Sequence, residues 1–208
     1  MNLALFDFDG TITNKDSLVD FIQYAVGKPK YYLGLLIQSP MLIAYKLKLL
    51  SNSRAKEKLL SHFFKGWSID DFTKQANTYS NTVLPKIVRT QALEEIKAHQ
   101  EKGHHIIIVS ASIECWLQAW CLHHSIELLS TRLEVKDNII TGKFSTPNCF
   151  GIEKVNRVKE KHDLSQYQHI YAYGDSSGDK ELLELAHECF YKPFRSEVTN
   201  QQLFKINE

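Results

Sequence analysis

The sequence has almost no net charge, because 25 lysines and arginines nearly balance 24 aspartates and glutamates. Proteins that bind nucleic acid usually carry a basic excess or stripe, so we expect no nucleic-acid partner. Cysteine is also scarce: the chain has four, and none of them form a CxxC pair. This spacing favours reduced thiols in a cytoplasmic protein over a disulfide framework. We also expect no signal peptide, because Asp7 and Asp9 interrupt the apolar start and no basic segment precedes it.

Long uninterrupted apolar runs are missing as well. The longest apolar stretch, residues 31–50, is broken by Gln38, Pro40, Lys46 and Lys48, whereas a membrane-spanning helix needs about 20 predominantly apolar residues. We predict a pair of helices that separate near Pro40. Two interpretations of their apolar surface stay open: packing within the protein or a dimer, and peripheral contact with a membrane.

What the sequence does contain is an alternation of strand and helix patterns. Apolar or β-branched runs predict strands at residues 3–8, 105–109, 126–129, 170–173 and 188–191. Helical periodicity predicts helices at residues 91–102, 113–124, 153–161 and 180–186. A hairpin with its turn at Asp137-Asn138 is expected over residues 132–144. The alternation predicts an α/β fold with a doubly wound parallel sheet.

Between the first two predicted strands the spacing is helical instead. Roughly 70 residues are too many for a crossover connection alone. We therefore predict a helical cap at residues 16–85, inserted into a catalytic core made of residues 1–15 and 86–208. Ser68 is the expected N-cap of one of the cap helices.

Polar side chains follow three of the predicted strands. Asp7 and Asp9 end the first strand, Ser110 ends the second, and Asp175 follows the strand at residues 170–173. In parallel sheets of this kind, ligands bind at the carboxyl ends of the strands. The sequence therefore predicts a ligand site where these side chains converge.

The residue types at this edge suit phosphoryl transfer. Asp7 could attack phosphorus as a nucleophile. Asp9 lies two residues on and on the same side of an extended segment, so it could protonate the leaving oxygen and then activate water. The carboxylates repel a phosphate, and Asp175 and Asp179 add oxygen ligands that suit Mg²⁺. Lys154 would add a fixed positive charge.

Four motifs in a fixed order resemble those of the haloacid dehalogenase-like (HAD) hydrolases. Residues 7–11 (DFDGT) match the first motif, and the apolar strand that ends at Ser110 matches the second. Lys154 matches the third, and residues 174–179 (GDSSGD) match the fourth. The ordered set covers nearly the whole chain and is far more specific than any single motif.

The resemblance implies a Mg²⁺-dependent phosphomonoester hydrolase with an aspartyl-phosphate intermediate on Asp7. Asp9 would be the general acid and base and would hold the metal through its backbone carbonyl. Asp175 would bind the metal directly, with Asp179 in support. A phosphotransferase such as a mutase would use the same nucleophile and stays an alternative.

The resemblance also assigns residues to the phosphate. Ser110 would donate a hydrogen bond to the phosphoryl group, and the backbone amides of Phe8, Asp9 and Ala111 would bind it. Thr11 would position Asp9, or it is simply a turn residue.

The placement of the cap resembles the phosphoserine phosphatase-like branch, subfamily IB. Ser110-Ala111-Ser112 and residues 151–154 are similar to a bacterial group that includes phosphatidylglycerophosphate phosphatases. Asp16 and Arg54 fall near positions that bind phosphoserine, although Asp16 is equally suited to cap a helix and Arg54 to lie on a solvated face. The apolar residues 31–50 favour a lipid phosphate instead, and the sequence does not fix the oligomeric state.

Overall fold

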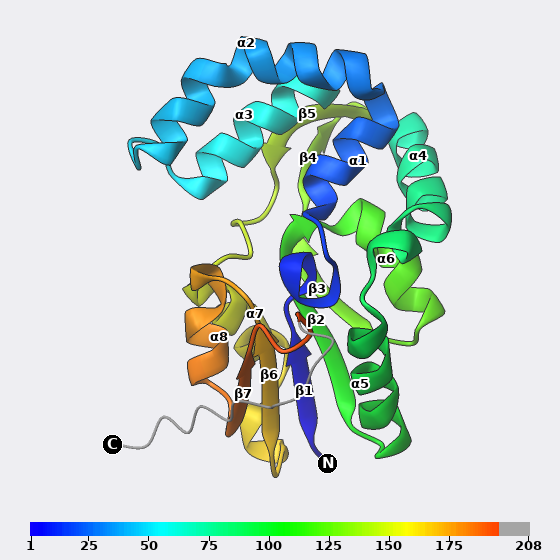
Figure 1. Cartoon of the computed structure of the whole chain (residues 1–208), viewed down its shortest axis with the longest axis vertical. Helices are drawn as coiled ribbons and strands as arrows, with labels where there is room; N and C mark the ends of the chain where they lie inside the picture. The colour runs from blue at the N-terminus through cyan, green and yellow to red at the C-terminus, as the bar shows by residue number, and fades with distance from the viewer. Residues whose placement is uncertain (196–208) are drawn as a thin grey trace.

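The computed structural model describes residues 1–195 and shows a parallel sheet beneath a group of helices (Figure 1). The sheet has five strands in the order β3-β2-β1-β6-β7, and all of its pairings are parallel. The strands are β1 (Leu3–Phe6), β2 (His105–Ile113), β3 (Glu127–Thr131), β6 (Ile170–Gly174) and β7 (Glu188–Tyr191). The predicted α/β fold with a parallel sheet is confirmed.

Helices cover both faces of this sheet, and the central strand shows why. All four residues of β1 are completely buried, and successive side chains point to opposite faces. Ala4 and Phe6 join the core under α5 and α6, whereas Leu3 and Leu5 join the core under α7 and α8. The helices are α5 (Thr90–Glu101), α6 (Glu114–His123), α7 (Ile152–Lys161) and α8 (Lys180–Glu184). A continuous apolar run without polar alternation is typical of such a doubly covered strand.

Residues 17–82, which lie between β1 and α5, form four helices over the carboxyl end of the sheet (Figure 1). They are α1 (Ser17–Val26), α2 (Lys28–Lys46), α3 (Asn52–Phe64) and α4 (Ile69–Thr82). Short helical turns lie at Phe8–Ile12, Leu84–Ile87, Leu164–Gln166 and Ser177–Asp179. Ser68 accepts a hydrogen bond from the backbone N–H of Asp70, so the predicted N-cap is confirmed. None of the helices within residues 1–195 is long and apolar enough to cross a bilayer.

The predicted hairpin forms and packs against the helices. It consists of β4 (Leu133–Lys136) and β5 (Ile139–Phe144), and both residues of its turn have positive φ. The Gly66 N–H donates to the Ile140 carbonyl, and the Ile140 N–H donates to the Trp67 carbonyl, each over 2.9 Å. A Cβ at Gly142 would collide with Ser61 of α3, so the close approach requires glycine. The hairpin therefore completes the helical layer, although the predicted division placed it in the core, and that division stays a prediction.

The expected break near Pro40 is wrong, because α2 runs without interruption from Lys28 to Lys46. Proline removes one helical hydrogen bond and crowds the carbonyl four residues earlier. Here that residue is Leu36, and it lies with Pro40 on the exposed side of the helix. Water can satisfy the freed carbonyl there, so the helix continues.

Candidate active site

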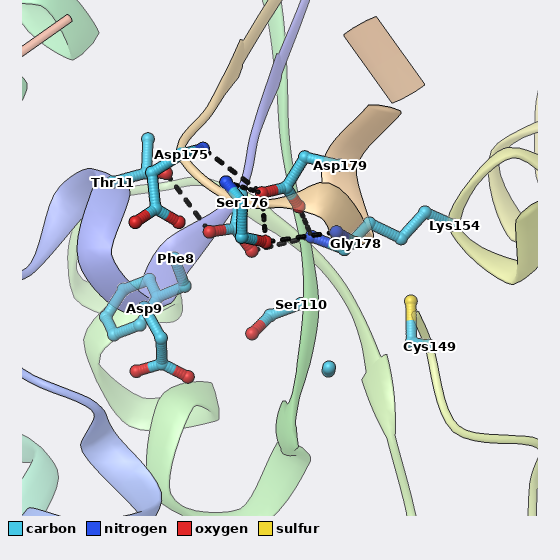
Figure 2. Close-up of polar contacts among 12 residues, drawn as sticks. Phe8, Asp9, Thr11, Ser110, Cys149, Lys154, Asp175, Ser176, Gly178 and Asp179 are labelled. Atoms are coloured by element: carbon cyan, nitrogen blue, oxygen red, sulfur yellow. Dashed lines mark hydrogen bonds and ion pairs between the residues drawn. The ribbon is translucent and has the colours of Figure 1, made fainter. Parts of the chain in front are cut away.

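The side chains predicted to converge at the sheet edge do so beneath the helical layer. Asp7 directly follows β1, Ser110 lies in β2, and Asp175 directly follows β6. Figure 2 shows Ser110 and Asp175 with Lys154 and Asp179 at this edge. Carboxylate oxygens of Asp7, Asp175 and Asp179 lie within 4.8 Å of one another. They line a cavity of about 570 Å³ between the sheet edge and α3. Because β1, β2 and β6 are parallel and adjacent, their carboxyl ends bring these residues together.

Asp7 is buried and held from both sides. Its backbone N–H donates to the carbonyl of Tyr173 on β6 over 2.9 Å. The Thr11 hydroxyl donates to Oδ2 over 3.1 Å, and the Lys154 Nζ donates to Oδ1 over 2.6 Å. Burial raises the pKa of Asp7 to about 7, and the positive charge of Lys154 opposes this shift. These hydrogen bonds fix the orientation of the Asp7 carboxylate. Its ionised form is nevertheless unfavourable in the buried site unless a further cation binds.

Lys154 is a completely buried ammonium between two carboxylates. It comes from α7, and its Nζ donates to Asp7 and to Asp179, each over 2.6 Å. Burial alone would lower the pKa of Lys154, but the two carboxylates outweigh it and the net shift is upward. The lysine therefore stays charged and supplies a fixed positive charge beside Asp7.

Asp179 anchors the loop that carries Asp175. Its Oδ2 accepts from the Asp175 N–H over 3.1 Å, and from the N–H and the hydroxyl of Ser176, both over 2.9 Å. Burial raises the pKa of Asp179, but Lys154 and these hydrogen bonds outweigh it, and the net shift is downward. Both carboxylate oxygens of Asp179 already accept hydrogen bonds. Asp179 is therefore suited to hold Lys154 and the Asp175 loop in place.

Asp9 occupies a different environment from Asp7. Its carboxylate points away from Asp175 and Asp179 (Figure 2), accepting from the Ser17 N–H over 2.7 Å and from the Ser112 hydroxyl. Burial and the nearby charge of Asp16 raise the pKa of Asp9 to about 6. A carboxyl group with a pKa near neutrality is suited to exchange protons with a substrate.

Two serines of β2 lie next to these carboxylates. The Ser110 hydroxyl oxygen accepts from the Ser112 N–H over 3.1 Å, and its own proton has no acceptor among residues 1–195. That proton is free for a ligand oxygen. Ser112 was not among the predicted site residues. Its position two residues after Ser110 was the available signal, because alternate residues of a strand share one face.

Other predicted contacts differ in detail. Thr11 bonds to Asp7 and not, as expected, to Asp9. Asp16 caps α1 by accepting from the Val19 N–H over 3.1 Å, and it also lines the cavity. Its expected capping role is therefore confirmed, and its contact with substrate stays a prediction.

Arg54 does not line this cavity, and its contact with substrate stays a prediction. It lines a separate hollow with Glu57 and Lys143. Lys56 and Asn52 of the same helix face the carboxylates instead, and Lys56 donates to the Ala111 carbonyl over 3.2 Å. A helix turns by about 100° per residue, so positions two apart face nearly opposite ways.

Phe8 and Ala111 lie at the floor of the site. The Phe8 ring is completely buried against Trp120, with ring centroids 5.5 Å apart, so only its backbone could meet a ligand. Ala111 lines the cavity. Binding of phosphate by their amides stays a prediction.

Residues 4–184 match the family of haloacid dehalogenase-like hydrolases. The chain belongs to this family. It is 33% identical over 195 residues to Protein CicA of Caulobacter vibrioides, covering 93% of this chain and 86% of that protein. It is 28% identical over 207 residues to the probable phosphatase Rv3661 of Mycobacterium tuberculosis, covering 92% of this chain and 69% of that protein. The expected family of hydrolytic enzymes is thus confirmed.

A solved structure of phosphoserine phosphatase, titled as a phospho-aspartyl intermediate analogue, shares the fold. Its TM-score is 0.66 at 18% identity, with 91% of this chain and 85% of that chain covered. The likeness extends over the sheet and the helical layer together. It supports the fold only, since the sequences have diverged far.

The donor set of this HAD hydrolase fits a divalent cation. The residues that line the cavity include five carboxylates and five lysines or arginines, so their formal charges balance. A bound Mg²⁺ would then leave a net positive cavity for a phosphate dianion. Gly10 lets the loop after Asp7 press onto Asp175, because a Cβ there would collide with its carboxylate. Oxygen ligands at this separation suit Mg²⁺, and Asp7 and Asp175 would be its direct ligands.

Proposed function

We propose that the chain is a Mg²⁺-dependent phosphomonoester hydrolase that forms an aspartyl-phosphate on Asp7. The observation that carries this proposal is the contrast between two neighbouring carboxyl groups. Asp7 is buried among metal-ligand carboxylates and Lys154, whereas Asp9 is directed elsewhere and hydrogen-bonded to Ser17 and Ser112. One group is placed to attack, and the other is placed to move protons.

In the first step a carboxylate oxygen of Asp7 attacks phosphorus, and the bond from phosphorus to the substrate oxygen breaks. Asp9 gives its proton to the leaving oxygen, which departs as an alcohol. Lys154 and the Ser110 hydroxyl stabilise charge on the phosphoryl oxygens. Mg²⁺, when bound, would neutralise the nucleophile and the phosphate and hold them together.

In the second step Asp9, now a carboxylate, takes a proton from a water molecule. That water attacks phosphorus, and the acyl-phosphate bond to Asp7 breaks to release inorganic phosphate. A mutase would instead pass the phosphoryl group to an alcohol. The similarity to a probable phosphatase supports hydrolysis. The substrate is either a small phosphate ester or a lipid phosphate.

The test is release of phosphate from p-nitrophenyl phosphate by the full chain. We expect turnover with Mg²⁺, loss of turnover with a chelator, and a fall of at least about a thousandfold in Asp7→Asn. The control is Asp71→Asn, a change of the same kind at an exposed position of α4. Turnover that survives Asp7→Asn would overturn the proposed nucleophile.

A further inference from the structure

The helix α2 carries an apolar face that residues 1–195 leave uncovered. Its inner side packs on α3, where Tyr31, Gly34 and Met41 are buried. Phe63 and His62 of α3 come so close to Gly34 that a Cβ would collide with them. The opposite side runs along the outer edge of the molecule (Figure 1). A helix with apolar residues on all sides normally has partners on all sides. Among residues 1–195, α2 has them only on its inner side.

The exposed side continues beyond the end of the helix. Leu36 is 70% exposed, and Leu47 and Leu49 in the turn after α2 are 64% and 77% exposed. The other exposed large apolar residues on this side are Tyr32, Leu33, Ile37 and Ile43. We call these seven residues the α2 face. Single exposed leucines are ordinary, but a contiguous set of this size marks an interaction surface.

The chain segment that contains the α2 face carries charges of one sign. Residues 21–56 contain six lysines and arginines and no aspartate or glutamate. Four of these cations, Lys28, Lys30, Lys46 and Lys48, lie in α2 or in the turn after it, whereas Arg54 and Lys56 of α3 line other hollows. Apolar side chains flanked by lysines suit the interface of a bilayer with anionic headgroups, where the apolar groups enter the acyl region and the ammonium groups meet the phosphates.

The turn after α2 connects this face to the active-site cavity. Lys48 has a φ of 60°, and the Leu49 N–H donates back to the Ala44 carbonyl over 2.9 Å. This closes the helix with Leu49 held outward. Three residues later, Asn52 lines the cavity that contains Asp7. The turn that carries Leu47 and Leu49 thus adjoins the segment that lines the cavity, whereas the outer side of α2 is separated from the cavity by α3.

We propose that the α2 face docks on an anionic lipid bilayer and presents the cavity to phosphate monoesters in that surface. Docking follows from the apolar and basic surface alone. The statement about substrate rests on the proposed function, because it needs the cavity to hydrolyse phosphate esters. The two parts are measured separately.

Docking is measured by co-sedimentation of the full chain with vesicles of phosphatidylcholine, with and without phosphatidylserine. The experiment uses Asp7→Asn as background, so that no chemistry is involved. We expect binding to the anionic vesicles that weakens with salt. Leu36→Glu and Leu47→Glu should each lower the partition coefficient about tenfold, since each withdraws one leucine from the apolar phase.

The matched control is Leu122→Glu on α6, where the leucine is 67% exposed but belongs to another surface. It should bind vesicles like the parent. Absence of binding by the parent, or equal losses in Leu36→Glu and Leu122→Glu, would overturn docking. A parent dimer that Leu36→Glu dissociates in sedimentation equilibrium would also overturn it, because a second copy would then cover the face.

The statement about substrate is tested on the active chain with phosphatidic acid in vesicles and with soluble p-nitrophenyl phosphate. Leu36→Glu should lower kcat/KM about tenfold for the vesicle substrate and leave the soluble substrate unchanged. Equal turnover of vesicle phosphate by parent and variant would overturn it. Failure of the proposed function is distinct: no phosphate would be released from either substrate, while vesicle binding would persist.

Discussion

The sheet edge around Asp7 and the α2 face depart from the usual distribution of side chains in opposite ways. At the sheet edge, charged groups are buried: Asp7, Lys154 and Asp179 are almost inaccessible to solvent. On α2, large apolar side chains are exposed. Most proteins keep charges outside and cover contiguous apolar surface, so both regions carry a free-energy cost that folding alone does not explain.

The difference lies in what offsets the cost. The buried charges are paired with one another by short hydrogen bonds, so the structure itself compensates them. The α2 face has no such compensation within residues 1–195. A site for chemistry is therefore complete apart from its ligands, whereas a docking surface is complete only with its partner.

Among the substitutions that test this comparison, Asp9→Asn should have the largest effect, a loss of catalytic rate at the sheet edge. The change removes the proton donor but leaves Asp7 and its partners in place. Loss of general acid–base catalysis costs about 10²- to 10⁴-fold in rate. The loss in kcat/KM should be greater for glycerol phosphate than for p-nitrophenyl phosphate, because p-nitrophenolate leaves without protonation. Equal losses for both esters would contradict a role in protonating the leaving oxygen.

Lys154→Met tests the compensation of buried charge. Asp7 and Asp179 would face each other without the ammonium, and removal of one member of a buried ion pair costs about 3 kcal/mol of unfolding free energy. Urea unfolding at neutral pH should show this loss, and added Mg²⁺ should recover part of it. Lys180→Met, on the exposed surface of α8, should change stability by less than about 1 kcal/mol. Equal stabilities for the two variants would contradict the account.

His99 is a buried polar residue outside the cavity. It tests whether a buried titratable side chain can serve stability without a role in catalysis. Its ring nitrogens contact Tyr173 and His104, and burial lowers its pKa from 6.5 to about 4. The unfolded chain therefore binds more protons between these pH values, so this contribution to stability is present above pH 6.5 and is lost as the pH falls towards 4.

The matching measurement compares the wild type with His99→Gln. The difference in their unfolding free energies should shrink by about 2 kcal/mol between neutral pH and pH near 4.5. Turnover of p-nitrophenyl phosphate at neutral pH should stay the same. A difference in stability that does not vary with pH would contradict the lowered pKa.

The smallest expected effect is that of the α2 face on soluble chemistry. Leu36→Glu should leave kcat and KM for p-nitrophenyl phosphate within about twofold, as exposed substitutions away from a site usually do. A large loss of p-nitrophenyl phosphate turnover would mean that the outer side of α2 affects the catalytic residues directly.

The sequence predicts the sheet edge well because its signals are local. Apolar runs that end at Asp7, Ser110 and Asp175 identify both the strands and the edge where they meet. Parallel pairing then forces the convergence, so no distant contact has to be guessed. The motif positions of Lys154 and Asp179 follow from the family resemblance.

The parts that the sequence did not predict depend on tertiary packing. The hydrogen bond from Ser112 to Asp9 joins residues far apart in the chain. Whether Arg54 or Lys56 faces the cavity depends on the rotation of α3 about its axis. The continuity of α2 through Pro40 depends on which side of the helix meets water. Local pattern placed Ser112 near Ser110, but it does not determine which distant residues meet.

The most direct test of the central claim is to identify the residue that receives the phosphoryl group. Protein quenched in acid during turnover and reduced with borohydride converts an aspartyl-phosphate into homoserine, which peptide mass spectrometry locates. The account predicts homoserine at position 7, dependent on substrate and Mg²⁺. Turnover with aspartate intact at position 7, or homoserine at any other position, would contradict it.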